Sequence, residues 1–203
     1  NNFTINDLHQ IAAWCRERGM KSYLTVNTVV FDGDMNLMRS IIDAAKEANI
    51  SAIIASDMAA ILYAREIGVE VHISTQVNVS NSEAVRFYSQ FADVMVLARE
   101  VNLEQVYNIH QTILREGICG PHGKPVRIEM FCHGALCMAI SGKCYLSLHE
   151  TGASANRGAC RQICRRSYTV TDRDSGDQLD IENQYIMSPK DLKTIHFLNK
   201  MID

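Results

Sequence analysis

The sequence is poor in the features that mark membrane and secreted proteins. Its 203 residues include three prolines and one tryptophan, and no apolar run approaches the roughly 18 residues that a spanning helix needs. The richest apolar stretch, Ile50 to Leu62, is interrupted by Asp57. The first residues have neither a basic start nor an apolar segment, so nothing in the chain directs secretion. We therefore expect a cytoplasmic protein that makes no contact with a membrane.

Familiar motifs of nucleotide binding and hydrolysis are also missing. No strand-like run is followed by G-x-G-x-x-G, and G-x-x-x-x-G-K-[ST] is absent, which argues against dinucleotide and P-loop sites. His149-Glu150 has no second histidine in the H-E-x-x-H pattern, and there is no G-x-S-x-G. These absences disfavour zinc-protease and serine-hydrolase mechanisms. The net charge of -3 gives no overall attraction to nucleic acid.

What the sequence does contain is an alternation of short β-rich runs with segments of helical period. The runs begin at Tyr23, Ala52, Val71, Val94 and Arg127. Apolar residues recur on one helical face from Asp34 to Asn49 and again from Leu103 to Leu114. Apolar strands that alternate with helices are typical of parallel βα units. The absence of a phosphate-binding fingerprint favours a barrel over an open doubly wound sheet.

The predicted fold class is therefore α/β, a partial parallel (β/α) TIM-like barrel with a Cys-rich irregular insertion near the C-terminus. A complete barrel usually takes about 250 residues, and only five strand-like runs precede the cysteines. We assign residues 1–131 to an incomplete βα barrel domain, 132–188 to a Cys-rich segment attached to the barrel, and 189–203 to the C-terminal helix of the barrel. That helix begins with Ser188 as N-cap and Pro189 in its first turn. Open strand edges would allow a homo-oligomer.

The cysteines are the strongest chemical signal in the chain. There are seven, an odd number, which favours thiol chemistry or a metal site over a disulfide framework. Four of them, Cys137, Cys144, Cys160 and Cys164, follow the pattern C-x6-C-x15-C-x3-C. Four thiolates suffice for a 4Fe-4S cluster or a tetrahedral zinc site, although these gaps match no common zinc ribbon. The alternative is four reduced thiols in an irregular loop.

Candidate catalytic residues stand at the end of the fifth strand-like run. Glu129 and His133 lie where barrel enzymes build their active sites, and strand parity points them to one side. They would act as general acid and base; the alternative is a glutamate bound to an arginine beside a structural histidine. Gln76 and Arg99 also end strands, and we predict that they bind substrate. Arg99 could instead pair with Glu100 or Glu129.

The segment from Cys137 to Thr171 is strongly basic. Its basic residues are Lys143, Arg157, Arg161, Arg165 and Arg166, and its one acid is Glu150. Such a patch suits an anionic substrate or an RNA backbone, so we assign Arg157, Arg161 and Arg165 to substrate binding. The alternative is that these arginines pack around an anionic thiolate site.

The stretch from Glu129 to Ser147 matches a family signature at every defined position. The signature reads Glu, any, Phe, two of any, Gly, Ala or Ser, aliphatic, Cys, four of any, Gly, any, Cys, any, aliphatic, Ser. On this match the chain resembles the peptidase U32 family. Similar segments at 74–76, 156–165 and 188–192 extend the resemblance over nearly the whole chain.

The resemblance implies a barrel-like domain and two kinds of activity. The family was first described as collagenase-like proteases, and related proteins are iron-sulfur proteins that hydroxylate bases of tRNA or rRNA, or a quinone ring, without oxygen. It implies a 4Fe-4S cluster, with zinc as the alternative. Lys193 stands where many relatives have a cysteine, which removes one possible ligand.

We therefore expect a U32-family enzyme. The leading interpretation is cluster-dependent hydroxylation of an RNA base, because the protease motifs are missing and the cysteine segment is basic. The first alternative is a collagenase-like peptidase that acts on a peptide substrate. The second is a non-catalytic RNA-binding module.

Overall fold

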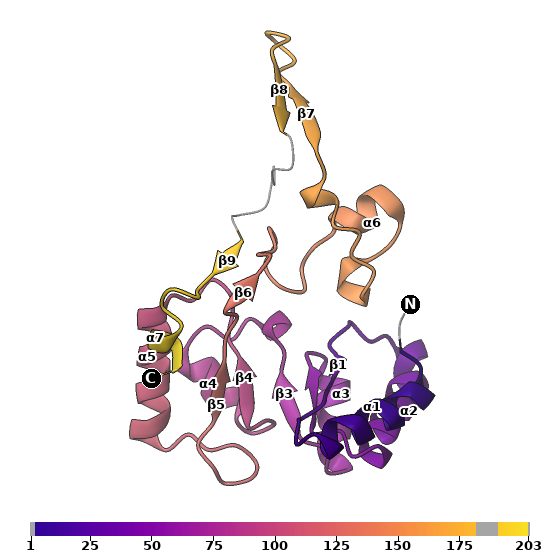
Figure 1. The fold of residues 1–203 in the computed structure, drawn as a ribbon, viewed down its shortest axis with the longest axis vertical. Coiled ribbons are helices and arrows are strands. Elements are labelled where there is room, and N and C mark those ends of the chain that lie inside the picture. The colour runs from indigo at the N-terminus through magenta and orange to yellow at the C-terminus, as the bar shows by residue number, and fades with distance from the viewer. Residues whose placement is uncertain (1–2, 182–190, 203) are drawn as a thin grey trace. The chain divides into compact units, whose positions relative to one another are not determined.

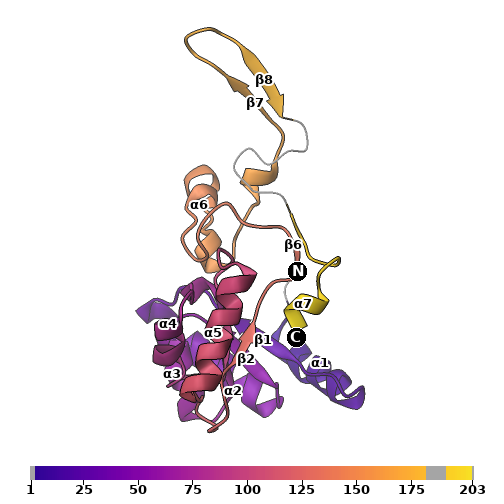
Figure 2. The same cartoon turned by 90° about the vertical axis from the view of Figure 1, so that its left-hand side faces the viewer.

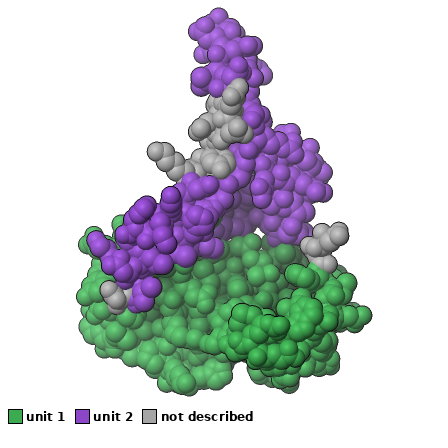
Figure 3. Space-filling model, in the orientation of Figure 1, with its two compact units in different colours: residues 1–130 green, residues 131–203 purple. Residues whose placement is uncertain are grey.

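The computed structural model describes residues 3–181 and 191–202. Two compact units are present, residues 1–130 and residues 131–203, which Figure 3 colours separately. The Ser188-Pro189 start of the expected last helix lies outside the described residues. No helix within the described ranges is long and apolar enough to cross a lipid bilayer.

The first unit is an α/β structure built on one parallel sheet (Figure 1). The strands, in their order across the sheet, are β1 (Tyr23–Val26), β2 (Ala52–Ala55), β3 (Val71–Ile73), β4 (Val94–Val96) and β5 (Arg127–Glu129). The helices are α1 (Ile5–Glu17), α2 (Met35–Glu47), α3 (Met58–Glu66), α4 (Ser82–Tyr88) and α5 (Leu103–Glu116). Short 3-10 turns occupy Asp32–Asp34 and Thr75–Val77. The α/β class and the five parallel strands are confirmed. The partial TIM-like barrel and the Cys-rich insertion stay predictions.

Several helix ends lie where local residue chemistry places them. The side chains of Asp57, Asn81 and Asn102 each accept a backbone N–H in the first turn of the helix that follows. Gly117 ends α5 with φ of 61°, a left-handed conformation that glycine adopts without steric cost. Asp34 precedes α2, but its carboxylate accepts from the N–H of Phe31 instead of capping the helix.

The two faces of the sheet differ sharply. On one face, apolar strand residues pack with helix residues in a single core; this core includes Val26, Ile53, Ala55, Ile73 and Met95 from the strands and Met38, Ile42, Ile61, Val85 and Ile113 from the helices. The alternate residues project to the other side. There Tyr23 on β1 is 44% exposed and the side chains of Arg127 and Glu129 on β5 are 55% and 44% exposed, whereas Ala52, His72 and Val94 on the strands between them are buried. We call this second side the open face.

The second unit contains short elements (Figures 1 and 2). They are α6 (Leu146–Thr151), 3-10 turns at Ala155–Arg157 and Ile163–Arg165, and a hairpin of β7 (Tyr168–Thr171) and β8 (Gln178–Ile181). A further antiparallel pair joins β6 (His133–Gly134) to β9 (Leu192–Lys193).

The structure of the described residues 191–202 differs from the helix predicted over residues 189–203. Within 191–202 the structure has strand β9, followed after a turn by a four-residue helix α7 (Asn199–Ile202). Lys193 pairs with His133, and the N–H of Thr194 donates to the carbonyl of Cys132. These backbone bonds come from residues about 60 positions away, so the local helix-start signal could not reveal them. The described part of this segment therefore belongs to the second unit.

Candidate functional site

Glu129 ends β5 and faces a histidine that is not among the predicted site residues. Its Oε1 lies 3.1 Å from Nδ1 of His72 on β3. The His72 side chain is 2% exposed, whereas that of Glu129 is 44% exposed. Contact with His72 lowers the pKa of Glu129 below its ordinary value, despite the opposing effect of burial. Nδ1 of His72 has no hydrogen-bond partner of good geometry, so its contact with Glu129 is close but poorly aligned.

His72 is held from its other side as well. Its Nε2 lies 3.4 Å from Oε1 of Glu70, and the Arg127 guanidinium donates to the same Glu70 oxygen at 2.8 Å. The Tyr23 ring lies 5.0 Å from the imidazole, centroid to centroid. We call Tyr23, Glu70, His72, Arg127 and Glu129 the open-face cluster. A histidine between two apolar residues in β3 was the only sequence signal for its centre.

The open-face cluster joins strands that are not neighbours. In the pairing register Val94 of β4 lies between His72 of β3 and Arg127 of β5. Val94 is 1% exposed, which agrees with charged side chains meeting above it. Layers built from alternate strands are a feature of the interior of TIM barrels.

The predicted substrate-binding residues Gln76 and Arg99 follow β3 and β4 at the carboxyl edge of the sheet. The Ser56 hydroxyl lies 3.2 Å from Oε1 of Gln76 and 2.9 Å from the carbonyl of Asn27. Three successive strand ends are thereby linked. Arg99 is half-buried. Substrate binding by Gln76 and Arg99 stays a prediction.

His133 belongs to the second unit, where it is exposed and pairs with Lys193 across the β6–β9 ladder. Glu129 belongs to the first unit, and its histidine neighbour there is His72. The assignment of Glu129 and His133 as an acid–base pair stays a prediction.

The four predicted ligand cysteines all belong to the second unit. All are free thiols, with Cys137 and Cys160 exposed and Cys144 and Cys164 half-buried. The pKa of Cys164 is raised, first by burial and then by the electrostatic effects of Cys137, Cys160 and Cys144. Hydrogen bonds join the segments that carry these cysteines: the N–H of Cys144 donates to Oδ1 of Asn156 at 3.2 Å, and the N–H of Arg161 donates to the Ser147 hydroxyl at 3.0 Å.

A cluster of ligands at metal-binding distances is absent from the described residues: no three His, Cys, Asp or Glu side chains converge there. The donor chemistry nevertheless fits an iron-sulfur cluster, which is held by four cysteine thiolates. Burial raises the pKa of Cys164 most and the other thiols raise it further; a cationic metal centre would favour the thiolate instead. Ligation by these four cysteines stays a prediction.

Arg165 is engaged within the second unit. Its guanidinium donates to the carbonyl of Leu136 at 3.1 Å and lies 3.4 Å from the Asp191 carboxylate, and its side chain is only 18% exposed. Its charge also lowers the pKa of Cys164, in opposition to the larger effects of burial and the other thiols. The role of Arg165 in substrate binding stays a prediction. Arg157 and Arg161 are exposed, and their role in substrate binding stays a prediction.

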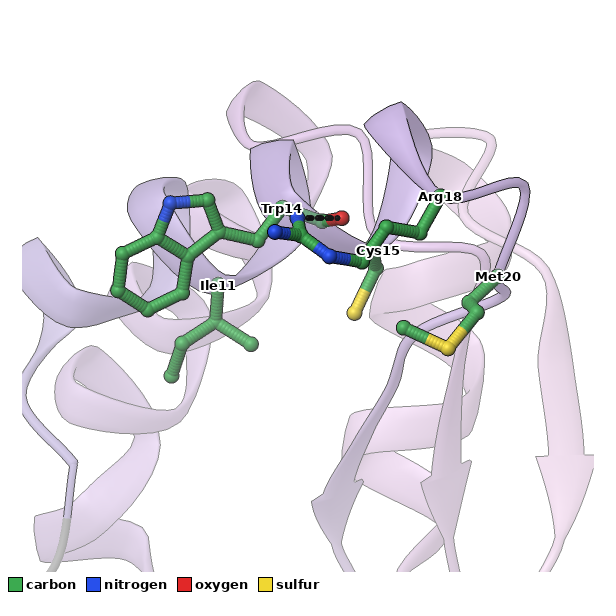
Figure 4. Close-up of a pocket in the computed structure, with 5 residues that line it drawn as sticks. All are labelled: Ile11, Trp14, Cys15, Arg18 and Met20. Carbon is green, nitrogen blue, oxygen red and sulfur yellow. Dashed lines mark hydrogen bonds between the residues drawn. The ribbon is translucent and has the colours of Figure 1, made fainter.

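A cavity of about 440 Å³ beside α1 contains none of the predicted site residues (Figure 4). It is lined by Ile11, Trp14, Cys15, Arg18 and Met20. The Arg18 guanidinium donates to the Trp14 carbonyl at 3.1 Å. The lining is otherwise apolar apart from the thiol, so no acid–base pair is available there.

Comparison with known proteins places these observations in a family. The model of "Peptidase family U32" matches residues 1–203. The chain is 74% identical to a collagenase of Porphyromonas gingivalis over its whole length, which covers 49% of that protein. It is 34% identical over its whole length to the tRNA hydroxylation protein P1 of Bacillus subtilis, covering 47% of it.

A third relative is the 23S rRNA 5-hydroxycytidine C2501 synthase of Escherichia coli, 35% identical over 98% of this chain and 29% of that protein. A solved structure of the U32 peptidase Mk0906 aligns with a TM-score of 0.43 at 20% identity, covering 51% of this chain and 47% of that one. The chain thus spans about half the length, or less, of these relatives. With the Glu129 to Ser147 signature and a family match over every residue, the chain belongs to peptidase family U32.

Proposed function

We propose that this chain is part of a U32 enzyme that hydroxylates an RNA base with the help of a 4Fe-4S cluster. The observation that carries the proposal is that hydrogen bonds join the segments on which Cys137, Cys144, Cys160 and Cys164 lie. These four residues would hold the cluster. When bound, it would supply electron-transfer chemistry that no amino-acid side chain provides.

The chain's own residues would bind and orient the RNA. Exposed Arg157 and Arg161 are suited to phosphate contacts, which supply affinity without reading sequence. Glu129, Gln76 and Arg99 stand at the carboxyl ends of strands, where polar groups can position a base. The names of two relatives, which refer to hydroxylation of tRNA and to 5-hydroxycytidine in rRNA, support this reading.

A collagenase-like peptidase is the second candidate, because the relative at 74% identity is named a collagenase. A Ser-His or Cys-His mechanism requires a nucleophile hydrogen-bonded to its base. Within residues 3–130, neither His72 nor Glu129 forms such a bond with a serine hydroxyl or a cysteine thiol. This ranks the peptidase second.

We also infer that the five-stranded sheet is one arc of a barrel. The strands follow one another in sequence order, without the reversal of a doubly wound sheet. Side chains from β1, β3 and β5 meet on the open face, as in the layered interior of a barrel.

Anaerobic purification of the protein, with iron and sulfide assays, tests the proposal. We expect a brown protein with iron and acid-labile sulfide, and loss of both in a Cys160→Ser variant. Incubation with RNA lacking the modification, in a lysate depleted of the endogenous enzyme, should then add the mass of one oxygen to a nucleoside. The matched control is Cys15→Ser, because Cys15 lies on α1 in the other unit.

Gelatin is the competing substrate. Cleavage of gelatin by protein from which all iron has been removed, together with unmodified RNA, would reverse the ranking in favour of the peptidase. RNA binding with neither activity would instead support the non-catalytic module.

A further inference from the structure

Within the open-face cluster, Glu129 is accessible whereas His72, which lies beside it, is buried. The Glu129 side chain is 44% exposed, whereas the His72 side chain is 2% exposed. A substrate on this face can therefore touch the Glu129 carboxylate but cannot reach the imidazole. Any influence of His72 on a substrate must pass through its neighbours.

The geometry assigns Glu129 as the group that binds an N–H donor of the substrate, with His72 as the positioning residue that orients its carboxylate. This rests on the proposed function and deepens it, since the donor on an RNA base would be its exocyclic amine or ring N–H. An ionised carboxylate is an acceptor only, so it selects such donors.

The two nitrogens of His72 have different neighbours. Nε2 faces Glu70 at 3.4 Å, and Glu70 is already bound by Arg127 at 2.8 Å. Nδ1 faces Glu129 at 3.1 Å and is buried without an aligned partner. A buried polar nitrogen lowers its free energy by finding an acceptor, and Glu129 is the nearby one. The Nδ1 side of the ring is therefore the side that holds Glu129.

The charges around Glu129 agree with this assignment. His72 and Arg127 favour its ionised form, and the Glu129 charge in turn raises the pKa of Tyr23, whose largest cause of elevation is burial. Glu70 is the remaining charged group of the cluster. The pKa of Glu129 is lowered by His72, so removing His72 should raise it. The acidic limb of any activity that needs the carboxylate would then move to higher pH.

Two substitutions of His72 test the contributions of its two ring nitrogens one at a time. Asn carries an amide nitrogen near the position of Nδ1, whereas Gln carries one near Nε2. We expect His72→Asn to keep part of the lowered Glu129 pKa and His72→Gln to lose it. The measurement is a carbon-13 NMR titration of the Glu129 carboxyl, assigned with Glu129→Gln. Thr25→Val is the control, because Thr25 is exposed on the same face and takes no part in the cluster.

The same variants are then assayed on unmodified RNA across pH. We expect Glu129→Gln to lower kcat/KM by about 10-fold to 100-fold, as loss of one charge-assisted hydrogen bond predicts. His72→Gln should shift the acidic limb upward more than His72→Asn does. A Glu129 pKa that is the same in folded His72→Gln and in the unsubstituted protein would overturn the inference. A shifted pKa in a protein that does not modify RNA would overturn the proposed function and leave the Glu129–His72 assignment standing.

Discussion

At the scale of single residues, a close packing contact lies at the amino end of β4. Asp93 is 6% exposed, and its carboxylate accepts from the backbone N–H of His122 at 3.1 Å and lies 2.6 Å from Nδ1 of the same residue. Gly120 lies directly against it. A Cβ on Gly120 would come within 2.8 Å of the Asp93 Cα, closer than real Cβ contacts. The loop after α5 is therefore held by a buried carboxylate that tolerates only glycine beside it.

Replacement of Gly120 by alanine should destabilise the protein by about 1–3 kcal/mol, the usual cost of forcing an extra carbon into a packed site. Urea unfolding followed by circular dichroism measures this. Gly33→Ala is the matched control, because Gly33 has no heavy atom within 4 Å of its added Cβ. Equal stabilities for the two variants would contradict the packing argument.

At the scale of elements, α5 shows how completely local chemistry can define a helix. Its N-cap Asn102 accepts from the N–H of Gln105 at 2.9 Å, and the Gln105 side chain accepts from the N–H of Asn102 at 2.9 Å. Gly117 closes the other end. Ile109 and Ile113 on one face are buried in the core. The helix is thus bounded by its own residues and attached to the sheet by its apolar stripe.

Asn102→Ala should therefore lower the free energy of unfolding by about 1 kcal/mol, the typical loss for an N-cap. Asn102→Asp keeps the acceptor and should recover most of that loss. Thermal and urea unfolding of both variants distinguish a capping role from a general sensitivity of this position, which would destabilise both equally.

At the scale of the whole molecule, the chain carries its basic and acidic residues unevenly. The segment from Cys137 to Thr171 contains five basic residues and one acidic residue, although the net charge of the protein is -3. In the second unit Arg165 is used in internal contacts, whereas the Arg161 side chain is exposed. A role in RNA binding should therefore be visible first at Arg161.

Arg161→Glu should weaken RNA binding about tenfold at low salt and reduce the dependence of log Kd on log salt by about one. Lys46→Glu, an equal change of charge on exposed Lys46 of α2 in the first unit, is the control and should have a smaller effect. Fluorescence anisotropy with a labelled RNA at several salt concentrations measures both. Equal losses for the two variants would indicate that only net charge matters.

Much of the first unit could be predicted from the sequence because its signals are local. The five strand-like runs start at the residues where β1 to β5 begin. The caps at Asp57, Asn81 and Asn102 depend on groups within three residues of each. The family signature is likewise a contiguous segment, and it led to the family that the whole-chain match confirms.

What only the tertiary structure decided depends on residues far apart in the chain. Strand parity predicted the side of the sheet to which Glu129 points. Its histidine neighbour is His72, 57 positions earlier in the sequence, and the pairing of β5 with β4 and of β4 with β3 brings the two residues together. The residues expected to continue as a C-terminal helix instead pair as β9 with β6. In both cases a short range of sequence was compatible with two arrangements, and contacts with residues far away in the chain selected one, which local sequence signals cannot reveal.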